Sequence, residues 1–438
     1  MHYYSTNHIS SKVNFKEATI KGLAPDKGLY FPENIPQLPK DFIKNIAQYT
    51  KEEIAITVIQ PYIGDLIPKN ELEKIVTETI NFDFPLVNVE KDFYSLELFH
   101  GPTLAFKDVG ARFMSRCLSY FVKDNRDNYQ AKKITVLVAT SGDTGGAVAN
   151  GFYDVEGVDV VILYPSGKVS SVQELQLTSL GKNITALEVN GTFDDCQHLV
   201  KKAFADETVN KELFLTSANS INIARWLPQQ FYYFFAYQQW DDKDAPPIIS
   251  VPSGNFGNIC AGLLAYKSGL PVKHFIAACN ANDVFPSYIK SGNYASQQSI
   301  TTLSNAMDVG DPSNFVRILE LFDQQFNSLK DIISSYSISD EEIKEVIKKV
   351  YSRSNYLLDP HGAVGYLGLV KYMQQQHGLK GIFLETAHPV KFYDVVEPII
   401  QQPVPIPAII QGLLKKEKQS IKMECDYTAF KDYLLARC

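Results

Sequence analysis

The chain has 438 residues, 45% of them hydrophobic and 21% charged, which is typical of a folded protein with a large core and room for two or three domains. Its formal net charge of -7 argues against nucleic acid as the main partner, because nucleic-acid binding requires a basic face. The amino terminus lacks the apolar core of a signal peptide and no apolar run approaches the roughly 20 residues that span a bilayer, so we expect a cytoplasmic protein with no membrane partner.

The first segment, residues 1–92, combines a stretch rich in glycine and proline (KGLAPDKGLYFPENIPQLP) with two helical patterns. These patterns are TKEEIAITVIQPYI at 50–63 and ELEKIVTETI at 71–80. We therefore expect a small, mostly helical N-terminal domain.

From residue 133 onward, short β-branched runs alternate with glycine-containing turns and helical segments. The runs are ITVLVA, DVVILY, ITALEVNG and IISVPS, and GIFLE at 381–385 is expected to be the final strand, after two helical patterns between 337 and 373. Apolar strands that alternate with helices indicate a parallel sheet covered on both faces. The fold class is therefore α/β, and its ligand site is expected at the carboxyl ends of the strands.

Two of the strand-to-helix junctions could bind an anion. One is Thr140–Gly146 (TSGDTGG) and the other is Ser253–Asn258 (SGNFGN). Glycines let backbone amides converge on an anion, and the helix dipole adds about half a positive charge there. An ordinary turn is the alternative for each loop, since neither matches a P-loop or a dinucleotide motif. Two such loops together suit a phosphorylated cofactor and an anionic substrate.

A lysine, Lys107, ends the almost uncharged run FHGPTLAFKD. Taken alone, this pattern is typical of a helix start, in which Gly101–Thr103 forms the turn and the lysine reaches solvent from an apolar face. The six cysteines contain no C-x-x-C pair, so we expect neither bound metal nor disulfides, and instead reduced packing residues. They are Cys117, Cys196, Cys260, Cys279, Cys425 and Cys438.

Five motifs taken in order, HGPTLAFKD, ATSGDTGGA, SANSINIARWLPQ, VPSGNFGNICAG and ETAHPVKF, closely resemble those of the threonine synthases. These are pyridoxal-phosphate enzymes of fold type II, the tryptophan-synthase-β-like fold. The opening GLAPDKGLYFP is similar to the N-terminal segment of that family, so the resemblance covers nearly the whole chain. It implies parallel sheets flanked by helices in two subdomains with a cleft between them, and the division 1–92, 93–400 and 401–438.

The resemblance also implies a cofactor site for pyridoxal 5'-phosphate. Lys107 is the residue that forms the Schiff base, and its apolar neighbourhood lowers the pKa of a lysine and so favours the neutral amine. The Thr386 hydroxyl meets the pyridine nitrogen and keeps it largely unprotonated. The cofactor phosphate is bound by the loop of Gly254, Asn255, Phe256, Gly257 and Asn258.

Two further segments are expected to bind the substrate by the same resemblance. One receives the carboxylate beside the 3'-oxygen of the cofactor, and the other binds the substrate phosphate, where a guanidinium gives bidentate recognition. The alternative role for Arg225 is a surface salt bridge, and His388 is interpreted as an oriented core histidine. Asn replaces Asp143 in several relatives of the wider fold, and a carboxylate beside a phenolate would be repulsive. The first segment is Ser141, Gly142, Asp143 and Thr144, and the second is Asn219, Ser220 and Arg225.

The implied reaction converts O-phospho-L-homoserine and water to L-threonine and phosphate, the last step of threonine biosynthesis, catalysed by a carbon-oxygen lyase. The sequence leaves open whether the enzyme is a monomer or a homodimer. A serine/threonine dehydratase-like lyase is the first alternative, but it needs no second anion site, whereas Arg225 and the Asn219–Ser220 pair supply one. A catalytically silent homologue that binds the cofactor is the second, but it would be expected to lack Lys107 or Thr386.

Overall fold

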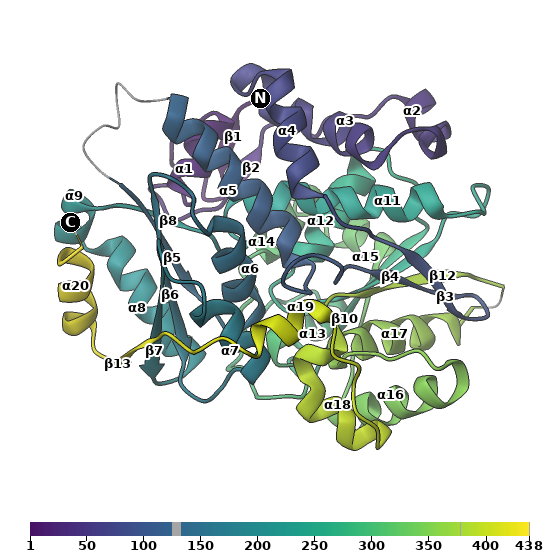
Figure 1. Ribbon diagram of the computed structural model, residues 1–438. Helices are drawn as coiled ribbons and strands as arrows, with labels where there is room; N and C mark the ends of the chain where they lie inside the picture. The colour runs from purple at the N-terminus through teal and green to yellow at the C-terminus, as the bar shows by residue number, and fades with distance from the viewer. Residues whose placement is uncertain (125–132, 377, 438) are drawn as a thin grey trace. The chain divides into compact units, whose positions relative to one another are not determined.

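The computed structural model describes residues 1–124, 133–376 and 378–437. The chain divides into two compact units, and Figure 1 labels many of their helices and strands. Unit 1 consists of Met1, Pro32–Phe106 and Trp226–Pro405, and unit 2 consists of His2–Phe31, Lys107–Arg225 and Ile406–Cys438. Each unit contains a largely parallel sheet together with helices. The predicted α/β fold is confirmed.

The sheet of unit 1 has six strands: β3 (Leu86–Glu90), β4 (Phe93–Glu97), β9 (Ile248–Pro252), β10 (His274–Cys279), β11 (Ile333–Ser337) and β12 (Gly381–Glu385). They lie in the order β11-β10-β9-β12-β4-β3. All neighbours run parallel except the antiparallel pair β3 and β4. Every residue of β9, β10 and β12 is buried, as expected of apolar strands in the middle of a covered sheet.

The helices of unit 1 include both helical patterns predicted near the amino terminus and the two predicted before β12. α17 contacts β9, β10 and β12 and so covers the middle of the sheet. Capping boxes begin α3 and α16 and satisfy amides that have no partner inside the helix. The helices are α2 (Lys40–Lys44), α3 (Lys51–Ile63), α4 (Lys69–Thr79), α11 (Phe231–Gln239), α12 (Gly257–Lys267), α13 (Val284–Ser291), α14 (Phe315–Leu321), α15 (Phe326–Ile332), α16 (Asp340–Ser354), α17 (Pro360–Met373) and α18 (Tyr393–Ile400).

The sheet of unit 2 has five parallel strands: β5 (Ile134–Ala139), β6 (Val158–Pro165), β7 (Ile184–Asn190), β8 (Phe214–Ser217) and β13 (Ile421–Glu424). Their order is β13-β7-β6-β5-β8. The apolar runs that begin at residues 134, 159 and 184 form strands as predicted. The prediction that 381–385 is the final strand was wrong, because β13 follows it. This strand of four mostly exposed residues is held by pairing with β7 rather than by an apolar pattern.

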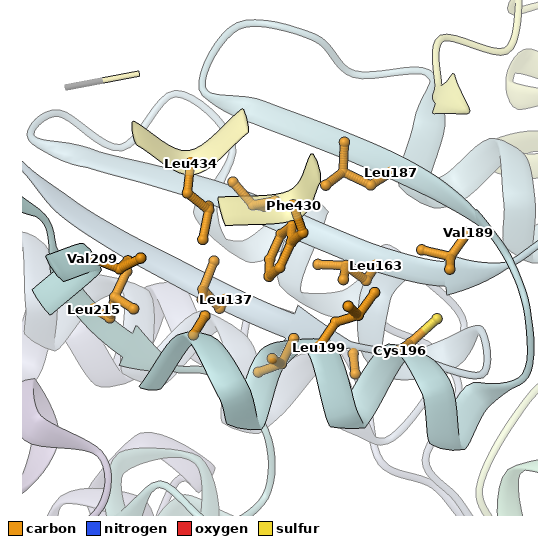
Figure 2. Close-up of a cluster of buried hydrophobic side chains, with 14 of the residues drawn as sticks. Leu137, Leu163, Leu187, Val189, Cys196, Leu199, Val209, Leu215, Phe430 and Leu434 are labelled. Atoms are coloured by element: carbon orange, nitrogen blue, oxygen red, sulfur yellow. The ribbon is translucent and has the colours of Figure 1, made fainter. Parts of the chain in front are cut away.

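The C-terminal helix completes the core of unit 2. Figure 2 shows Phe430 and Leu434 in one buried cluster with Leu199 of α8 and with Leu137 and Leu163 of the sheet. A small separate sheet pairs β1 (Tyr3–Ser5) with β2 (Tyr30–Pro32). The helices are α1 (Phe15–Lys21), α5 (Lys107–Asp124), α6 (Asp143–Phe152), α7 (Ser171–Thr178), α8 (Phe193–Ala205), α9 (Glu207–Glu212), α19 (Ala408–Leu413) and α20 (Tyr427–Leu435), with α10 (Ile223–Trp226) at the chain boundary between the units.

The cysteines of the described residues are free thiols. Four of them are buried as predicted, but Cys425 is exposed because it follows the exposed strand β13, so its prediction as a packing residue was wrong. Cys438 lies outside the described residues. Among the helices that the structure describes, each is too short or too polar to cross a membrane.

Candidate functional site

Three loops that carry or precede predicted site residues leave neighbouring strands of unit 1. The loop after β9 contains Gly254–Asn258, the loop after β12 contains Thr386, and the loop after β4 leads to Lys107. The strands β9, β12 and β4 are adjacent and parallel. Because the carboxyl ends of parallel strands meet at one edge of a sheet, the three loops begin side by side.

The chain before Lys107 is paired with the segment that contains Thr386. The Phe106 amide donates to the Thr386 carbonyl at 2.9 Å, and Ala105 forms an antiparallel bridge with Ala387. Lys107 then begins α5 and is half-buried. The predicted helix start is confirmed, and the register of this pairing fixes where the helix begins.

The loop after β9 is open to an anion at the start of α12. Phe256 has a left-handed backbone with φ 58° and is the N-cap of this 11-residue helix. Among the described residues, the amides of Phe256, Gly257 and Asn258 have no hydrogen-bond partner. Gly254 allows close packing, because a Cβ atom there would lie 2.6 Å from Cα of Met307. Backbone amides and the positive end of the helix dipole therefore converge on this loop.

The side chain of Asn258 supports the same interpretation. Its Oδ1 atom accepts hydrogen bonds from the hydroxyls of Tyr232 at 2.8 Å and Tyr233 at 2.7 Å. Burial raises the pKa of both tyrosines well above the ordinary value, so both remain donors. The buried Nδ2 atom of Asn258 has no partner among the described residues. An unsatisfied buried donor beside three available amides fits a bound phosphate group.

A hydrogen-bond network holds this loop in place, and it is formed by residues that the sequence analysis did not single out. The Asn255 carbonyl accepts from Nδ2 of Asn314 at 3.0 Å, and its Oδ1 accepts from the Ser313 amide at 2.6 Å. The Arg317 guanidinium donates to Oδ1 of Asn314 at 2.8 Å and lies 4.5 Å from the ring centre of Trp226. Residues 313–317 lie outside the five motifs, so no local pattern indicated them.

Thr386 is buried at the end of β12, directly after the buried carboxyl group of Glu385. Burial, together with Asp359, raises the pKa of Glu385 well above its ordinary value. The Glu385 Oε1 atom accepts from the Asp359 amide at 2.7 Å. This raised pKa favours the neutral form of the Glu385 carboxyl group and so disfavours a negative charge beside the Thr386 hydroxyl.

The substrate loops predicted in unit 2 follow two adjacent strands, β5 and β8. The Nδ2 atom of Asn219 donates to the carbonyl of Ala139 at 3.1 Å, which ties the loop after β8 to the end of β5. The Thr140 hydroxyl accepts from the amides of Gly142 at 2.9 Å and Gly145 at 2.8 Å. Several donors of this loop are therefore satisfied by the loop itself.

Asp143 is the first residue of α6 and is buried. Its Oδ1 atom accepts from Nε2 of Gln173 at 2.9 Å, and Gln173 belongs to the capping box that begins α7. Gly142 has φ 134°, and a Cβ atom there would lie 2.5 Å from the Gln173 side chain. This glycine is therefore required both by its backbone angle and by the close approach of Gln173.

Arg225 is only 3% exposed, so the alternative of a surface salt bridge was wrong. It donates through Nη1 to the carbonyl of Ala218. Burial lowers the pKa of Arg225 to about 10, and the charge of Asp108 opposes this shift. A Cβ atom on Gly110 would lie 2.5 Å from the Arg225 carbonyl. The helix that begins with Lys107 therefore packs directly against Arg225.

His388 accepts a hydrogen bond from the Val390 amide through Nδ1 at 3.0 Å. Its ring packs edge-on against Phe99, with the ring centres 5.2 Å apart. Burial, and then the charge of His100, lower the pKa of His388 to about 4. It is therefore a neutral, oriented histidine at physiological pH.

Comparisons with known proteins cover the whole chain. Three family models match: pyridoxal-phosphate dependent enzyme over residues 83–382, threonine synthase N terminus over 2–80, and threonine synthase C-terminal over 362–434. The threonine synthase of Haemophilus influenzae is 43% identical, covering 99% of this chain and 100% of that protein, and that of Escherichia coli K12 is 41% identical, covering 99% of each.

Two solved structures are also similar over their full length. The threonine synthase of Escherichia coli has a TM-score of 0.93 with 40% identity and covers 100% of both chains. A PLP-bound threonine synthase from Brucella melitensis has a TM-score of 0.91 with 34% identity, covering 100% of this chain and 99% of that one.

Proposed function

Because the chain belongs to the threonine synthase family of pyridoxal-phosphate-dependent lyases, we propose that its predicted motif residues perform the roles that the family's chemistry requires. The activity is the conversion of O-phospho-L-homoserine and water to L-threonine and phosphate, in threonine biosynthesis. Membership of this family supports the threonine synthase activity over the dehydratase-like and catalytically silent alternatives. Pyridoxal phosphate, when bound, supplies the electron sink for the substrate carbanions.

In this proposal, unit 1 holds the cofactor phosphate and ring, and Lys107 holds the cofactor covalently. The open amides of Phe256–Asn258 and the free Nδ2 donor of Asn258 support phosphate binding at this loop. The raised pKa of Glu385, which directly precedes Thr386, supports a hydroxyl partner for an unprotonated pyridine nitrogen. The other residues proposed for the phosphate loop are Gly254 and Asn255.

The substrate is proposed to bind through two groups of residues in unit 2. Ser141–Thr144 would receive the carboxylate, and Asn219, Ser220 and Arg225 would bind the phosphate. The adjacency of β5 and β8 supports a shared site, and the burial of Arg225 strengthens a charge-assisted bond by excluding water. Lys107 would remove the proton at Cα and then one at Cβ, so that phosphate leaves from Cγ before water adds at Cβ.

The observation that carries this assignment is the strand order β9-β12-β4. It brings the loops of three motifs, which are far apart in the sequence, to one edge of one sheet. Incubation of the purified protein with O-phospho-L-homoserine should yield L-threonine and phosphate in equal amounts. Borohydride reduction should then leave the pyridoxyl group on Lys107. A reduced pyridoxyl group on another lysine would overturn the assignment of Lys107 while leaving the family membership intact.

Three broader features are also proposals. We propose that the enzyme acts in the cytoplasm, binds a small-molecule substrate without nucleic acid, and is a monomer or homodimer. We also propose that the chain has an N-terminal domain at 1–92, a catalytic region at 93–400 and a C-terminal extension at 401–438. The match of the N-terminal family model to residues 2–80 supports its first boundary.

A further inference from the structure

Lys391 is a lysine in the interior of unit 1 that the proposed chemistry does not use. It is 0% exposed and lies in the 3₁₀ helix Pro389–Phe392, after Thr386 in the same loop. Its Nζ atom donates to the carbonyl of Thr103 at 2.9 Å. Moving an ammonium group out of water is costly, so a buried lysine in this place requires a reason.

The residue after Thr103 has an unusual backbone. Leu104 has φ 56°, a left-handed conformation that is unfavourable for a large side chain and is maintained only when the surroundings impose it. Its side chain is buried. Leu104 stands three residues before Lys107, so its backbone angles set the direction in which the chain approaches that residue.

Both peptide groups that flank Leu104 accept a hydrogen bond from the segment after β12. The carbonyl before it, on Thr103, accepts from Nζ of Lys391. The carbonyl after it, on Leu104 itself, accepts from the His388 amide at 3.1 Å. These two peptide planes determine φ and ψ of Leu104. The Leu104 amide also donates to the Gly101 carbonyl at 3.0 Å, so the two hydrogen bonds hold the strained conformation together with this local turn.

We propose that Lys391 is a positioning residue for Lys107: its ammonium group holds the left-handed backbone at Leu104 and thereby places Lys107 for covalent attachment of the cofactor. The inference rests on the proposed role of Lys107. It assigns Lys391 no contact with the substrate or the reacting atoms. Its effect should therefore be seen wherever Lys107 is present and disappear where Lys107 is absent.

The test compares Lys391→Met in two full-length backgrounds, one with Lys107 and one with Lys107→Ala. Equilibrium dialysis of pyridoxal phosphate measures the dissociation constant in each. With Lys107 present, the substitution should raise this constant about tenfold, because residues in one network couple strongly. In the Lys107→Ala background the change should stay below about threefold, since the phosphate loop is untouched. An equal effect in both backgrounds, or no effect with Lys107 present, would overturn the inference.

Rescue at position 104 gives an independent measurement. Glycine adopts positive φ without strain, so Leu104→Gly added to Lys391→Met should restore at least half of the lost affinity on a logarithmic scale. If Lys391→Met alone does not fold, the double variant should fold and bind the cofactor. A double variant that also fails to fold, or that folds with no recovery of affinity, would make Lys391 a residue of the fold alone and overturn the inference.

Lys371→Met is a control for the loss of a lysine that donates to a backbone carbonyl in unit 1. Lys371 donates to the carbonyl of Ser337 at 3.3 Å, is partly exposed and also pairs with Glu342 at 2.8 Å. Its cofactor affinity should not change, and a loss equal to that of Lys391→Met would count against the inference.

Borohydride mapping of the unaltered protein separates the proposed role of Lys107 from the proposed positioning role of Lys391. A pyridoxyl group on a lysine other than Lys107 refutes the proposed role of Lys107 and this inference together, and leaves the threonine synthase activity untouched. A group on Lys107, with Lys391→Met without effect, refutes this inference alone.

Discussion

The loops after β9 and after β5 have similar sequences but differ in the hydrogen-bonding groups they leave available. After β9, the amides of Phe256–Asn258 lack partners among the described residues. After β5, the Thr140 hydroxyl binds the amides of Gly142 and Gly145, and a carboxylate, Asp143, occupies the start of the helix. A carboxylate there already interacts with the helix dipole and repels a second anion. The first loop therefore suits a phosphate dianion, and the second suits a group of lower charge.

The largest effect is expected for Lys107→Ala. It removes the proposed covalent link to the cofactor, so that cofactor binding then depends on noncovalent contacts such as those of the phosphate loop. Turnover should fall by about 10³-fold or more, because proton transfer by a positioned side chain contributes roughly 10²–10⁴-fold. The apoprotein should still prefer pyridoxal phosphate over pyridoxal, as measured by equilibrium dialysis. Equal affinity for the two would mean that the loop after β9 does not bind the phosphate.

The next largest effects are expected for a pair of substitutions that tests which ligand each of the two loops binds. Gly257→Val obstructs the approach of a phosphate to the start of α12 and should raise the dissociation constant of pyridoxal phosphate roughly 10- to 100-fold, the value of one charge-assisted hydrogen bond. The left-handed residue of this loop is Phe256 rather than Gly257, so the substitution introduces no backbone strain.

Its counterpart is Gly142→Ala in the loop after β5, where the added Cβ atom meets Gln173. This change should raise KM for O-phospho-L-homoserine and leave cofactor affinity within about threefold, since the phosphate loop after β9 is untouched. Melting of each apoprotein shows whether the variant is folded. If Gly142→Ala lost the cofactor and Gly257→Val kept it, the roles of the two loops would be reversed.

The contrast between the loops shows what the sequence could predict. Apolar runs identified β5 and β9, and the glycines after them located two loops at strand ends. The order of the strands could not be predicted, because the position of β12 between β9 and β4 depends on pairing between distant segments. The partners that distinguish the loops, such as Gln173 and Asn314, lie outside the motifs, and only the folded chain brings them to the loops.

A smaller effect is expected for Arg225→Lys, which tests phosphate binding in unit 2. Turnover of O-phospho-L-homoserine should fall more than about tenfold, because lysine does not reproduce the paired donors of a guanidinium and a charge-assisted bond contributes roughly 1.5–3 kcal/mol. The spectral response of the bound cofactor to L-serine, which has a carboxylate but no phosphate, should persist. Equal losses with both ligands would make Arg225 a structural residue, as its bond to the Ala218 carbonyl would allow.

The smallest effect is expected for Asp143→Asn, which removes the charge that distinguishes the loop after β5. The Asn amide oxygen can still accept from Gln173, so the contact at 2.9 Å should survive. Loss of a carboxylate at a helix start should lower the free energy of unfolding of the apoprotein by about 0.3–1 kcal/mol, measured by urea denaturation at low salt. Because Asp143 is held by Gln173, cofactor affinity should change by less than about threefold.

If the carboxylate instead lay beside the phenolate oxygen of the cofactor, its removal would relieve a repulsion between like charges. Cofactor binding would then tighten at least about tenfold, and the absorbance maximum of the bound cofactor would shift. That outcome would place Asp143 in the cofactor site and contradict its assignment to the loop that receives the substrate carboxylate.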